Sequence, residues 1–353
     1  MAAALRLAGV CLGRVWPNPA VGCLIIKDDK TVGRGWTQPG GRPHAEFEAL
    51  QMAGAKAKGA TAYVTLEPCA HEGETRSCAR LLAGAGVKRV VYSVSDPDPR
   101  TAGKGAEILK KAGVQVDYGL LEEEAKTLNK GYFLKQTEGR PLVTMKLATS
   151  RDGKIAEREG VETRITGRQA REYSHHLRAS HDAILVGIGT VLADDPDLTC
   201  RLPDKDVTSP VRIVLDTNLR IPVASRLVQS ANKVPVWVVT EQTEIPPELA
   251  GKGVEIVSLG NIKNIKQVLE LIAQKGITRL LVEGGSGVNA SFLKSGLVDD
   301  IYWFTAPHLT IGAGGVPAFR DLDITEPKDL PNYKKSSEEG LGKDIVEILE
   351  RLD

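Results

Sequence analysis

The sequence has little of what membrane-spanning and secreted proteins depend on. No apolar run approaches the roughly 18 consecutive residues that a membrane-spanning helix needs. The N-terminal segment, MAAALRLAGVCLG, has neither a basic leader nor a clean cleavage site. The five cysteines are too few and too scattered for a disulfide framework. We therefore predict a cytoplasmic protein without membrane contact, in which any special cysteine is a metal ligand or a nucleophile.

Net charge is nearly absent as well. Lys and Arg total 46 and Asp and Glu total 45, which gives a formal charge of +1. No overall positive field is then available to hold a polyanion, so the composition argues against nucleic-acid binding. At about 150 residues per domain, a chain of 353 residues is expected to form two folded domains.

Strand-like and helix-like segments alternate along the chain, and this alternation predicts an α/β fold. In the first part, the strand-like AVGCLII, ATAYVTL and KRVVYSV alternate with the helical HAEFEALQMAGAKA and CARLLAGAG. A single helix, LEEEAKTLNKGYFLKQ, closes this series, and TEGRP then supplies Gly and Pro before a new strand, LVTMKLA. We place a domain boundary there, between residues 1–139 and residues 140–353.

The second part has its own alternation and therefore its own core. Its strand-like segments are AILVG, VRIVLD, VPVWVV and TRLLVEGG, and its helical segments are GRQAREYSHHLRA, IKNIKQVLELIAQKG and SGVNASFLKSG. No internal repeat relates the two parts. The sequence predicts two unlike α/β domains.

A candidate zinc site is present in the first part. His44 and Glu46 open a helical segment, Cys69 follows a strand-like run, and Cys78 opens the next helix. Catalytic zinc takes three protein ligands and keeps one position for water, and His44, Cys69 and Cys78 would supply one nitrogen and two thiolates. Glu46 is then left over as a proton shuttle, as in nucleobase deaminases. A single histidine or cysteine in such a position is usually a packing residue. The occurrence of all four residues in this order favours a metal site instead.

The second part contains two glycine-rich loops that follow strand-like segments. One comprises Glu283–Gly287, and the other contains Gly187, Gly189, Thr190, Asp194 and Asp195. Glycine lets the backbone approach a phosphate, and the following helix N-terminus attracts the anion. A tight turn between strand and helix also needs glycine, so one loop is a weak signal, whereas two together favour a dinucleotide site. Arg178 and Arg201 flank this region; they either bind a phosphorylated substrate or are ordinary surface residues.

Together these segments resemble the bifunctional riboflavin-biosynthesis deaminase–reductase family over nearly the whole chain. The resemblance rests on Pro17-Asn18-Pro19 with Val21-Gly22, His44-Ala45-Glu46, GATAYVTLEPCAH, Asp96-Pro97-Asp98-Pro99, KLATSRDGKIA, VLADDPDLTCR and VEGG. Their order along the chain also matches that of the family.

The resemblance implies a cytidine-deaminase-like domain over residues 1–139. That domain would use Zn²⁺ to remove the ring amine of 2,5-diamino-6-(5-phosphoribosylamino)pyrimidin-4-one and would release ammonia. His44, Cys69, Cys78 and Glu46 take the roles given above, and Asn18 and His71 would line the pocket for the base.

The resemblance also implies a dihydrofolate-reductase-like domain over residues 140–353, which would use NADPH to reduce the ribose of the deaminated product to ribityl. Family positions for the cofactor fall on Ala148, Arg164, Thr190, Asp194, Thr217, Gly285, Ser286, Gly287, Val288, Asn289, Ala290 and Ser291. Family positions for the substrate fall on Glu162, Arg178, Leu198, Arg201 and Glu283. Lys146 lies close enough in its motif to help polarise the sugar. We also expect the protein to form a homo-oligomer, either a dimer or a tetramer.

Two positions depart from the family pattern. Glu74 stands where most relatives have a basic residue that could meet the substrate phosphate, so in the deaminase this contact is left to Arg76. In the reductase, Arg164 stands where the family has an aromatic residue in the wall of the cofactor site. Two alternatives therefore stay open. One is a reductase with a degenerate, structural deaminase domain, and the other is a zinc domain that binds RNA, which the near-zero net charge disfavours.

Overall fold

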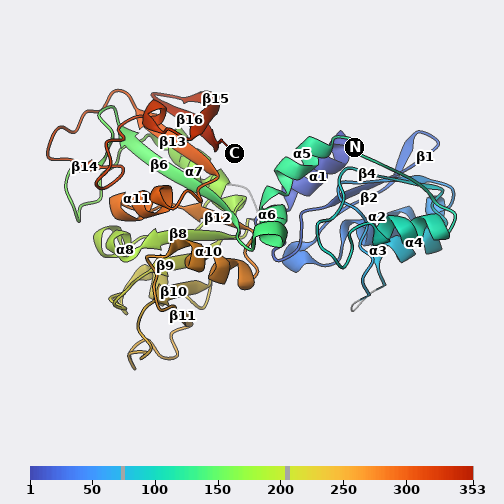
Figure 1. The fold of residues 1–353 in the computed structure, drawn as a ribbon, viewed down its shortest axis with the longest axis horizontal. Helices are drawn as coiled ribbons and strands as arrows, with labels where there is room; N and C mark the ends of the chain where they lie inside the picture. Colours follow the sequence, from blue (N-terminus) through green and yellow to red (C-terminus); the bar gives the residue numbers. More distant parts are fainter. Residues whose placement is uncertain (73–75, 203–206, 353) are drawn as a thin grey trace. The chain divides into compact units, whose positions relative to one another are not determined.

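A computed structural model of the chain describes residues 1–72, 76–202 and 207–352. It divides into two compact units, Met1–Gly139 and Arg140–Asp353, and each unit combines a mainly parallel or mixed sheet with helices (Figure 1). The predicted α/β class is confirmed in both. Among the helices that the structure describes, none combines the length and apolar composition needed to cross a bilayer.

The N-terminal unit is built on a five-stranded sheet in the order β2-β1-β3-β4-β5. Strand β1 is antiparallel to β2 and β3, while β3, β4 and β5 are parallel. The strands are β1 (Gly22–Lys27), β2 (Lys30–Trp36), β3 (Thr61–Val64), β4 (Arg89–Tyr92) and β5 (Gln115–Tyr118). The helices are α1 (Ala2–Val10), α2 (Ala45–Ala53), α3 (Cys78–Gly84), α4 (Lys104–Lys111), α5 (Glu122–Leu128) and α6 (Lys130–Glu138), with 3₁₀ turns η1 (Pro39–Gly41) and η2 (Gly54–Ala57).

Two glycines of β2 bring helix α2 directly onto the sheet. A Cβ atom at Gly33 would lie 2.1 Å from the carbonyl oxygen of Ala49, and one at Gly35 would lie 2.2 Å from that of Ala45. Only glycine permits such close approach of the two backbones. The helix presents the fully buried Ala45 and Ala49 to the strand. This contact fixes the N-terminus of α2, and with it the position of His44.

One predicted helix is two helices in the structure. The segment LEEEAKTLNKGYFLKQ forms α5 and α6, which meet at Asn129. The buried side chain of Asn129 accepts a hydrogen bond from the Ala20 backbone N–H (2.9 Å) and donates one to the Ala20 carbonyl oxygen (2.9 Å). The prediction of one continuous helix was wrong because this long-range pairing breaks the helix where the local pattern continues.

The C-terminal unit is built on a nine-stranded sheet in the order β11-β10-β9-β8-β12-β6-β13-β16-β15, which Figure 1 shows with helices beside it. The pairs from β11 to β13 are parallel, and β16 and β15 extend the sheet as antiparallel strands. A separate small sheet pairs β7 (Lys154–Ala156) with β14 (Val316–Pro317). The predicted strands at AILVG, VRIVLD, VPVWVV and TRLLVEGG are confirmed.

The bounds of the main-sheet strands in this unit are β6 (Leu142–Ser150), β8 (Ala183–Gly187), β9 (Val211–Leu215), β10 (Val236–Thr240), β11 (Val254–Ser258), β12 (Arg279–Val282), β13 (Asp300–Ala306), β15 (Tyr333–Leu341) and β16 (Asp344–Arg351). The helices are α7 (Arg168–Ala179), α8 (Ile188–Asp194), α9 (Arg226–Gln229), α10 (Ile265–Gln274) and α11 (Ser286–Lys294), with the 3₁₀ turn η3 (Pro327–Asp329).

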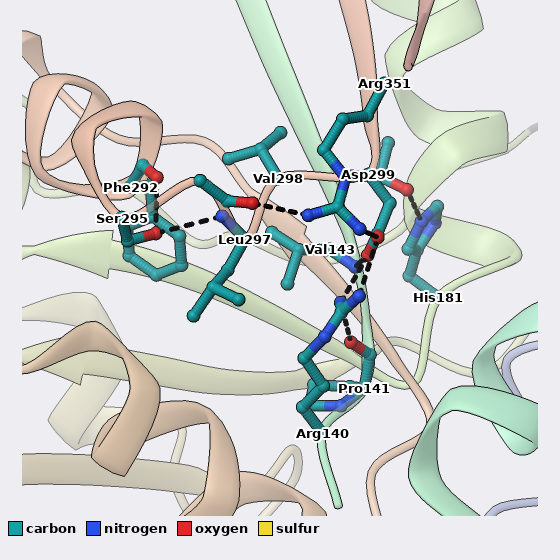
Figure 2. A network of polar contacts seen from close by, with 12 residues as sticks. Arg140, Pro141, Val143, His181, Phe292, Ser295, Leu297, Val298, Asp299 and Arg351 are labelled. Atoms are coloured by element: carbon teal, nitrogen blue, oxygen red, sulfur yellow. Dashed lines mark hydrogen bonds and ion pairs between the residues drawn. The ribbon is translucent and has the colours of Figure 1, made fainter. Parts of the chain in front are cut away.

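A buried ion pair joins the starts of the two central strands β6 and β13 (Figure 2). The carboxylate of Asp299 accepts hydrogen bonds from both terminal nitrogens of Arg140 (2.7 and 3.0 Å) and from the Val143 backbone N–H (2.9 Å). Arg351 adds a contact of 3.3 Å. The side chains of Asp299 and Arg140 are 2% and 5% exposed. Such a fully bonded buried pair fixes the register of β6, whose other half lines the cavity described below.

Candidate functional site

The three predicted metal ligands come together in the N-terminal unit. His44 precedes α2, Cys69 follows β3, and Cys78 is the first residue of α3. Their ligand atoms all lie within 4.8 Å of one another. Nδ1 of His44 lies 3.7 Å from Sγ of Cys69 and 3.4 Å from Sγ of Cys78.

These distances fit a zinc ion. Zinc–sulfur bonds of about 2.3 Å and zinc–nitrogen bonds of about 2.0 Å, at a tetrahedral angle, separate the nitrogen from each sulfur by about 3.5 Å. The two observed separations, 3.4 and 3.7 Å, lie on either side of that value. One imidazole and two thiolates are also the ligand types that zinc prefers. The chain therefore contains a zinc site with three protein ligands.

One of the two thiols, that of Cys69, is held in the thiolate form that a metal requires. The hydrogen bond with the Cys78 side chain, together with His44, lowers the pKa of Cys69 to about 4, against the opposing effect of burial. The backbone N–H of Cys78, at the start of α3, also donates to Sγ of Cys69 (3.2 Å), as expected at a helix N-terminus. The hydrogen bond with Cys69 and burial raise the pKa of Cys78. Binding of the ion therefore releases the proton that the two sulfurs share.

Glu46 lies beside the ligands without belonging to them. It occupies the first turn of α2, is 4% exposed and lines the same cavity as His44 and Cys69. Burial, followed by the charge of Cys69, raises the pKa of Glu46 to about 7. A carboxyl group with a pKa near neutrality can both accept and donate a proton, which is the property of a general acid–base.

A cavity of about 250 Å³ opens over these residues, and it contains both residues predicted to line the base pocket, Asn18 and His71. Asn18 is placed by the left-handed Gly41 (φ 86°), where a Cβ atom would lie 1.8 Å from the Asn18 side-chain nitrogen. Nδ1 of His71 lies 3.5 Å from the hydroxyl of Thr101. The rest of the lining is Pro17, Pro19, Val21, Thr37, Leu66, Glu67, Asp96, Asp98, Arg100, Tyr132, Lys135 and Gln136.

The C-terminal unit has a larger cavity of about 860 Å³. Most of the residues predicted for the reductase line it: Ala148, Glu162, Thr190, Asp194, Thr217, Glu283, Gly285, Ser286, Gly287, Val288, Asn289 and Ser291. Five predicted residues lie outside its lining: Arg164, Arg178, Leu198, Arg201 and Ala290. Lys146, on β6, also lines it.

The two predicted glycine loops meet at this cavity. A Cβ atom at Gly187 or at Gly284 would lie 2.7 or 2.6 Å from the side chain of Val288, so glycine lets β8 and α11 approach each other. Helix α11 begins immediately after Gly285. Within the described residues, the buried hydroxyl of Ser286 has no hydrogen-bond partner. A helix start at the cavity wall with an unsatisfied hydroxyl suits a phosphate group of a dinucleotide.

The charges at the end of β12 form a closely coupled group. Arg178 makes two hydrogen bonds to Glu283 (2.8 and 2.9 Å), and both side chains are mostly buried. Burial opposes ionisation, but Arg178 and Lys146 outweigh it and lower the pKa of Glu283 to about 2. Burial and the charge of Arg178 lower the pKa of Lys146. Arg178 thus acts on the cavity through Glu283.

The other predicted residues do not line the cavity. Arg201 and Arg164 are exposed, and the guanidinium of Arg201 lies 3.3 Å from the carboxylate of Asp197. Leu198 and Ala290 are buried. Glu74, whose acidic side chain motivated one alternative, lies outside the described residues.

Several residues that line the smaller cavity could not be identified from motifs or residue spacing in the sequence. Tyr132 and Lys135 come from α6, and Arg100 comes from the loop before α4. The motif Asp96-Pro97-Asp98-Pro99, which contributes to the family resemblance, supplies two buried carboxylates to the lining. These residues are distant in sequence and reach the cavity only through the topology of the sheet.

Comparison with known families gives a result for each unit. A family model described as the cytidine and deoxycytidylate deaminase zinc-binding region matches residues 1–94. A second model, described as the RibD C-terminal domain, matches residues 141–346. The first match includes His44, Cys69 and Cys78, and the second includes the larger cavity.

Whole-chain relatives have both units in the same order. The chain is 40% identical over 351 residues to the riboflavin biosynthesis protein RibD of Aquifex aeolicus, covering 99% of this chain and 97% of that protein. It is 38% identical to the solved structure of Acinetobacter baumannii RibD, with a TM-score of 0.90 and coverage of 100% and 98%. A Thermotoga maritima structure, named as a diaminohydroxyphosphoribosylaminopyrimidine deaminase/5-amino-6-(5-phosphoribosylamino)uracil reductase, is 35% identical, with a TM-score of 0.87 and coverage of 99% and 97%.

Proposed function

This chain belongs to the RibD family of bifunctional riboflavin-biosynthesis deaminase–reductases, and we propose that it acts on two successive phosphoribosyl pyrimidines. The N-terminal unit hydrolyses the ring amine of 2,5-diamino-6-(5-phosphoribosylamino)pyrimidin-4-one. The C-terminal unit then reduces the ribose of the product to ribityl with NADPH. The similarity to the Thermotoga protein, whose name includes both activities, supports this pair of substrates.

In the deaminase, Glu46 moves the protons. A zinc ion held by His44, Cys69 and Cys78 would lower the pKa of water and so supply a nucleophile at neutral pH. Glu46 accepts one proton from the attacking water and gives it to the adjacent ring nitrogen, then transfers the second proton, from the added hydroxyl, to the amine, which leaves as ammonia while the carbon becomes a carbonyl. Its burial beside the ligands, at 4% exposure, suits this role. Asn18 and His71 orient the base within the cavity.

In the reductase, we propose that NADPH occupies the cavity lined by Ala148, Thr190, Asp194, Thr217 and the first turns of α11. A volume of about 860 Å³ is within the range of cofactor sites. When bound, the cofactor supplies the hydride, so the residues of the chain mainly position the ribose and accommodate its charges. Glu283 and Lys146 lie where they would contact the sugar, and Arg178 holds Glu283 in place.

One observation carries the proposed deaminase activity: the His44 and cysteine atoms are spaced for zinc with Glu46 next to them. A degenerate domain kept for structure would have no need of this complete set. An RNA-binding module would need clustered cations along a surface, and the net charge of +1 offers no support for one.

The test is a two-step assay on one zinc-loaded sample. The diaminopyrimidine ribotide is supplied first alone and then with NADPH, and ammonia release and NADPH oxidation are measured. We expect ammonia without NADPH, and NADPH oxidation only after deamination. If NADPH is consumed only when the deaminated compound is supplied ready-made, the degenerate alternative is correct. Light scattering on the same sample tests our further proposal of a homodimer or homotetramer.

A further inference from the structure

We propose that Lys135 and Arg100 bind the 5-phosphate of the pyrimidine ribotide in the deaminase cavity. This inference rests on the proposed deaminase function and names the residues that recognise the part of the substrate that does not react. Both residues line the cavity that also contains His44, Cys69 and Glu46. Among the described residues that line it, they are the only lysine and arginine.

The carboxylates of the cavity already have partners. Glu67 accepts hydrogen bonds from the backbone N–H groups of Gly103 (3.0 Å) and Ala106 (3.1 Å). Asp98 is buried and accepts from the guanidinium of Arg100 at 2.5 to 3.0 Å. The oxygens of these two carboxylates are therefore already engaged as hydrogen-bond acceptors.

Asp96 is likewise committed. It accepts hydrogen bonds from the hydroxyl of Tyr132 (3.0 Å) and from the Asp98 backbone N–H (2.9 Å). Burial raises the pKa of Asp96 to about 6, so this carboxylate becomes neutral only as the pH falls below that value.

Lys135 is the cation that remains. Its ammonium group makes no ion pair with any carboxylate in the part of the chain that the structure describes. It is half-buried on α6, and burial together with the charge of Arg100 lowers its pKa, against the opposing effect of Asp98. Arg100 and Lys135 therefore both lie near Asp98 in this cavity, and a dianionic phosphate can accept hydrogen bonds from the two cations together.

The substrate carries a phosphate group that these two cations can bind. The ring carbon that loses its amine must lie beside the zinc ligands, and the ribose phosphate must then extend to another part of the same cavity. Arg100 offers guanidinium N–H groups beyond those that bind Asp98, and Lys135 offers an ammonium group. The sequence pointed instead to Arg76, which is exposed and does not line the cavity.

Lys135→Met tests the inference because it keeps the apolar stem and removes the charge. Deamination is measured with the pyrimidine ribotide and with the same compound lacking its phosphate. We expect kcat/KM for the ribotide to fall by about tenfold to a hundredfold, the range for a hydrogen bond to a charged group, mainly through KM. The value for the compound without phosphate should not change. Lys135→Arg should retain most of the preference, and Lys110→Met, at an exposed position of α4, is the matched control.

Equal losses on both compounds would show a structural role for Lys135, and no loss would show that it does not contact the phosphate; either result overturns the inference. Binding of ribose 5-phosphate to zinc-loaded wild type, Lys135→Met and Arg100→Gln provides a second measurement. We expect weaker binding to both variants, and unchanged binding would overturn the inference. Wild type that deaminates neither compound would refute the proposed function, while the binding measurement would still decide the roles of Lys135 and Arg100.

Discussion

Glu46→Gln separates the proton shuttle from the metal site more cleanly than any other single change. Gln has the shape of Glu but can neither accept nor deliver the proton at neutral pH. Glu46 is not among the residues whose atoms converge on the zinc position, so the variant should bind zinc with wild-type stoichiometry. Loss of a general acid–base typically costs about 10²- to 10⁴-fold in rate, and we expect a loss of ammonia release in that range.

The structure also predicts what this substitution leaves intact. Burial raises the pKa of Glu46 to about 7, which means that its charged form is disfavoured by the fold. A neutral amide at this position should therefore not lower the thermal unfolding temperature. Reduction of the deaminated compound with NADPH should continue at the wild-type rate, since the C-terminal unit has its own cavity.

The assay compares zinc content, ammonia release and NADPH oxidation for wild type, Glu46→Gln and Glu48→Gln. Glu48 lies on the same helix and undergoes the same chemical change, but it does not line the cavity. Ammonia release by Glu46→Gln at the rate of wild type would refute the shuttle role. Loss of zinc from Glu46→Gln would instead show that this carboxylate helps to hold the metal.

Three further predictions concern the ligands and the two buried ion pairs. Cys78→Ser should lose zinc, deaminase activity and thermal stability together, as metal analysis and thermal unfolding would show; retention of zinc would contradict its role as a ligand. Asp299→Asn should destabilise the protein by about 3–5 kcal/mol, because Arg140 is left as a buried charge without its full partner; a thermal unfolding temperature equal to that of wild type would contradict this. Glu283→Gln should be destabilising at pH 7, and its deficit should shrink only as the pH falls from about 4.5 towards about 2, because the folded-state pKa of Glu283 is held below its ordinary value; a deficit that disappears by pH 6 would exclude this mechanism.

The zinc site could be predicted from sequence because its signal is local. His44 and Glu46 lie within one helical turn, Cys69 lies in the loop that follows a strand, and Cys78 starts a helix. Few other functions need these residue types in this order. The prediction therefore needed only the alternation of strands and helices, which apolar periodicity indicates well.

The phosphate-binding side of the same cavity could not be predicted in this way. Lys135 belongs to a helix whose pattern is that of an ordinary closing helix, and Arg100 belongs to a loop. Nothing in the spacing of these residues relates them to His44. The break at Asn129, which sets the direction of α6, depends on a pairing with Ala20, 109 positions away. Long-range contacts of this kind override local propensity.

The strand β15 escaped prediction for a different reason. Its residues, YKKSSEEGL, are exposed along nearly the whole strand, so they show no apolar alternation. The strand exists because its backbone pairs with β16, which alternates buried and partly buried residues. Periodicity detects burial of side chains, and it fails where backbone pairing alone defines the element.

The near-zero net charge and the two anionic substrates are compatible because the relevant charges are local. Around Glu283 the cations Arg178 and Lys146 outnumber one carboxylate, and beside Asp98 the cations Arg100 and Lys135 do the same. Each group places two cations beside one carboxylate at or next to a cavity. A single phosphate group can contact such a pair of cations, whereas a polyanion needs a long track of cations that the composition does not provide. Recognition in both units is thus expected to depend on the position of a few local charges, and a variant that moves one of them should change substrate affinity without any measurable change in the overall charge of the protein.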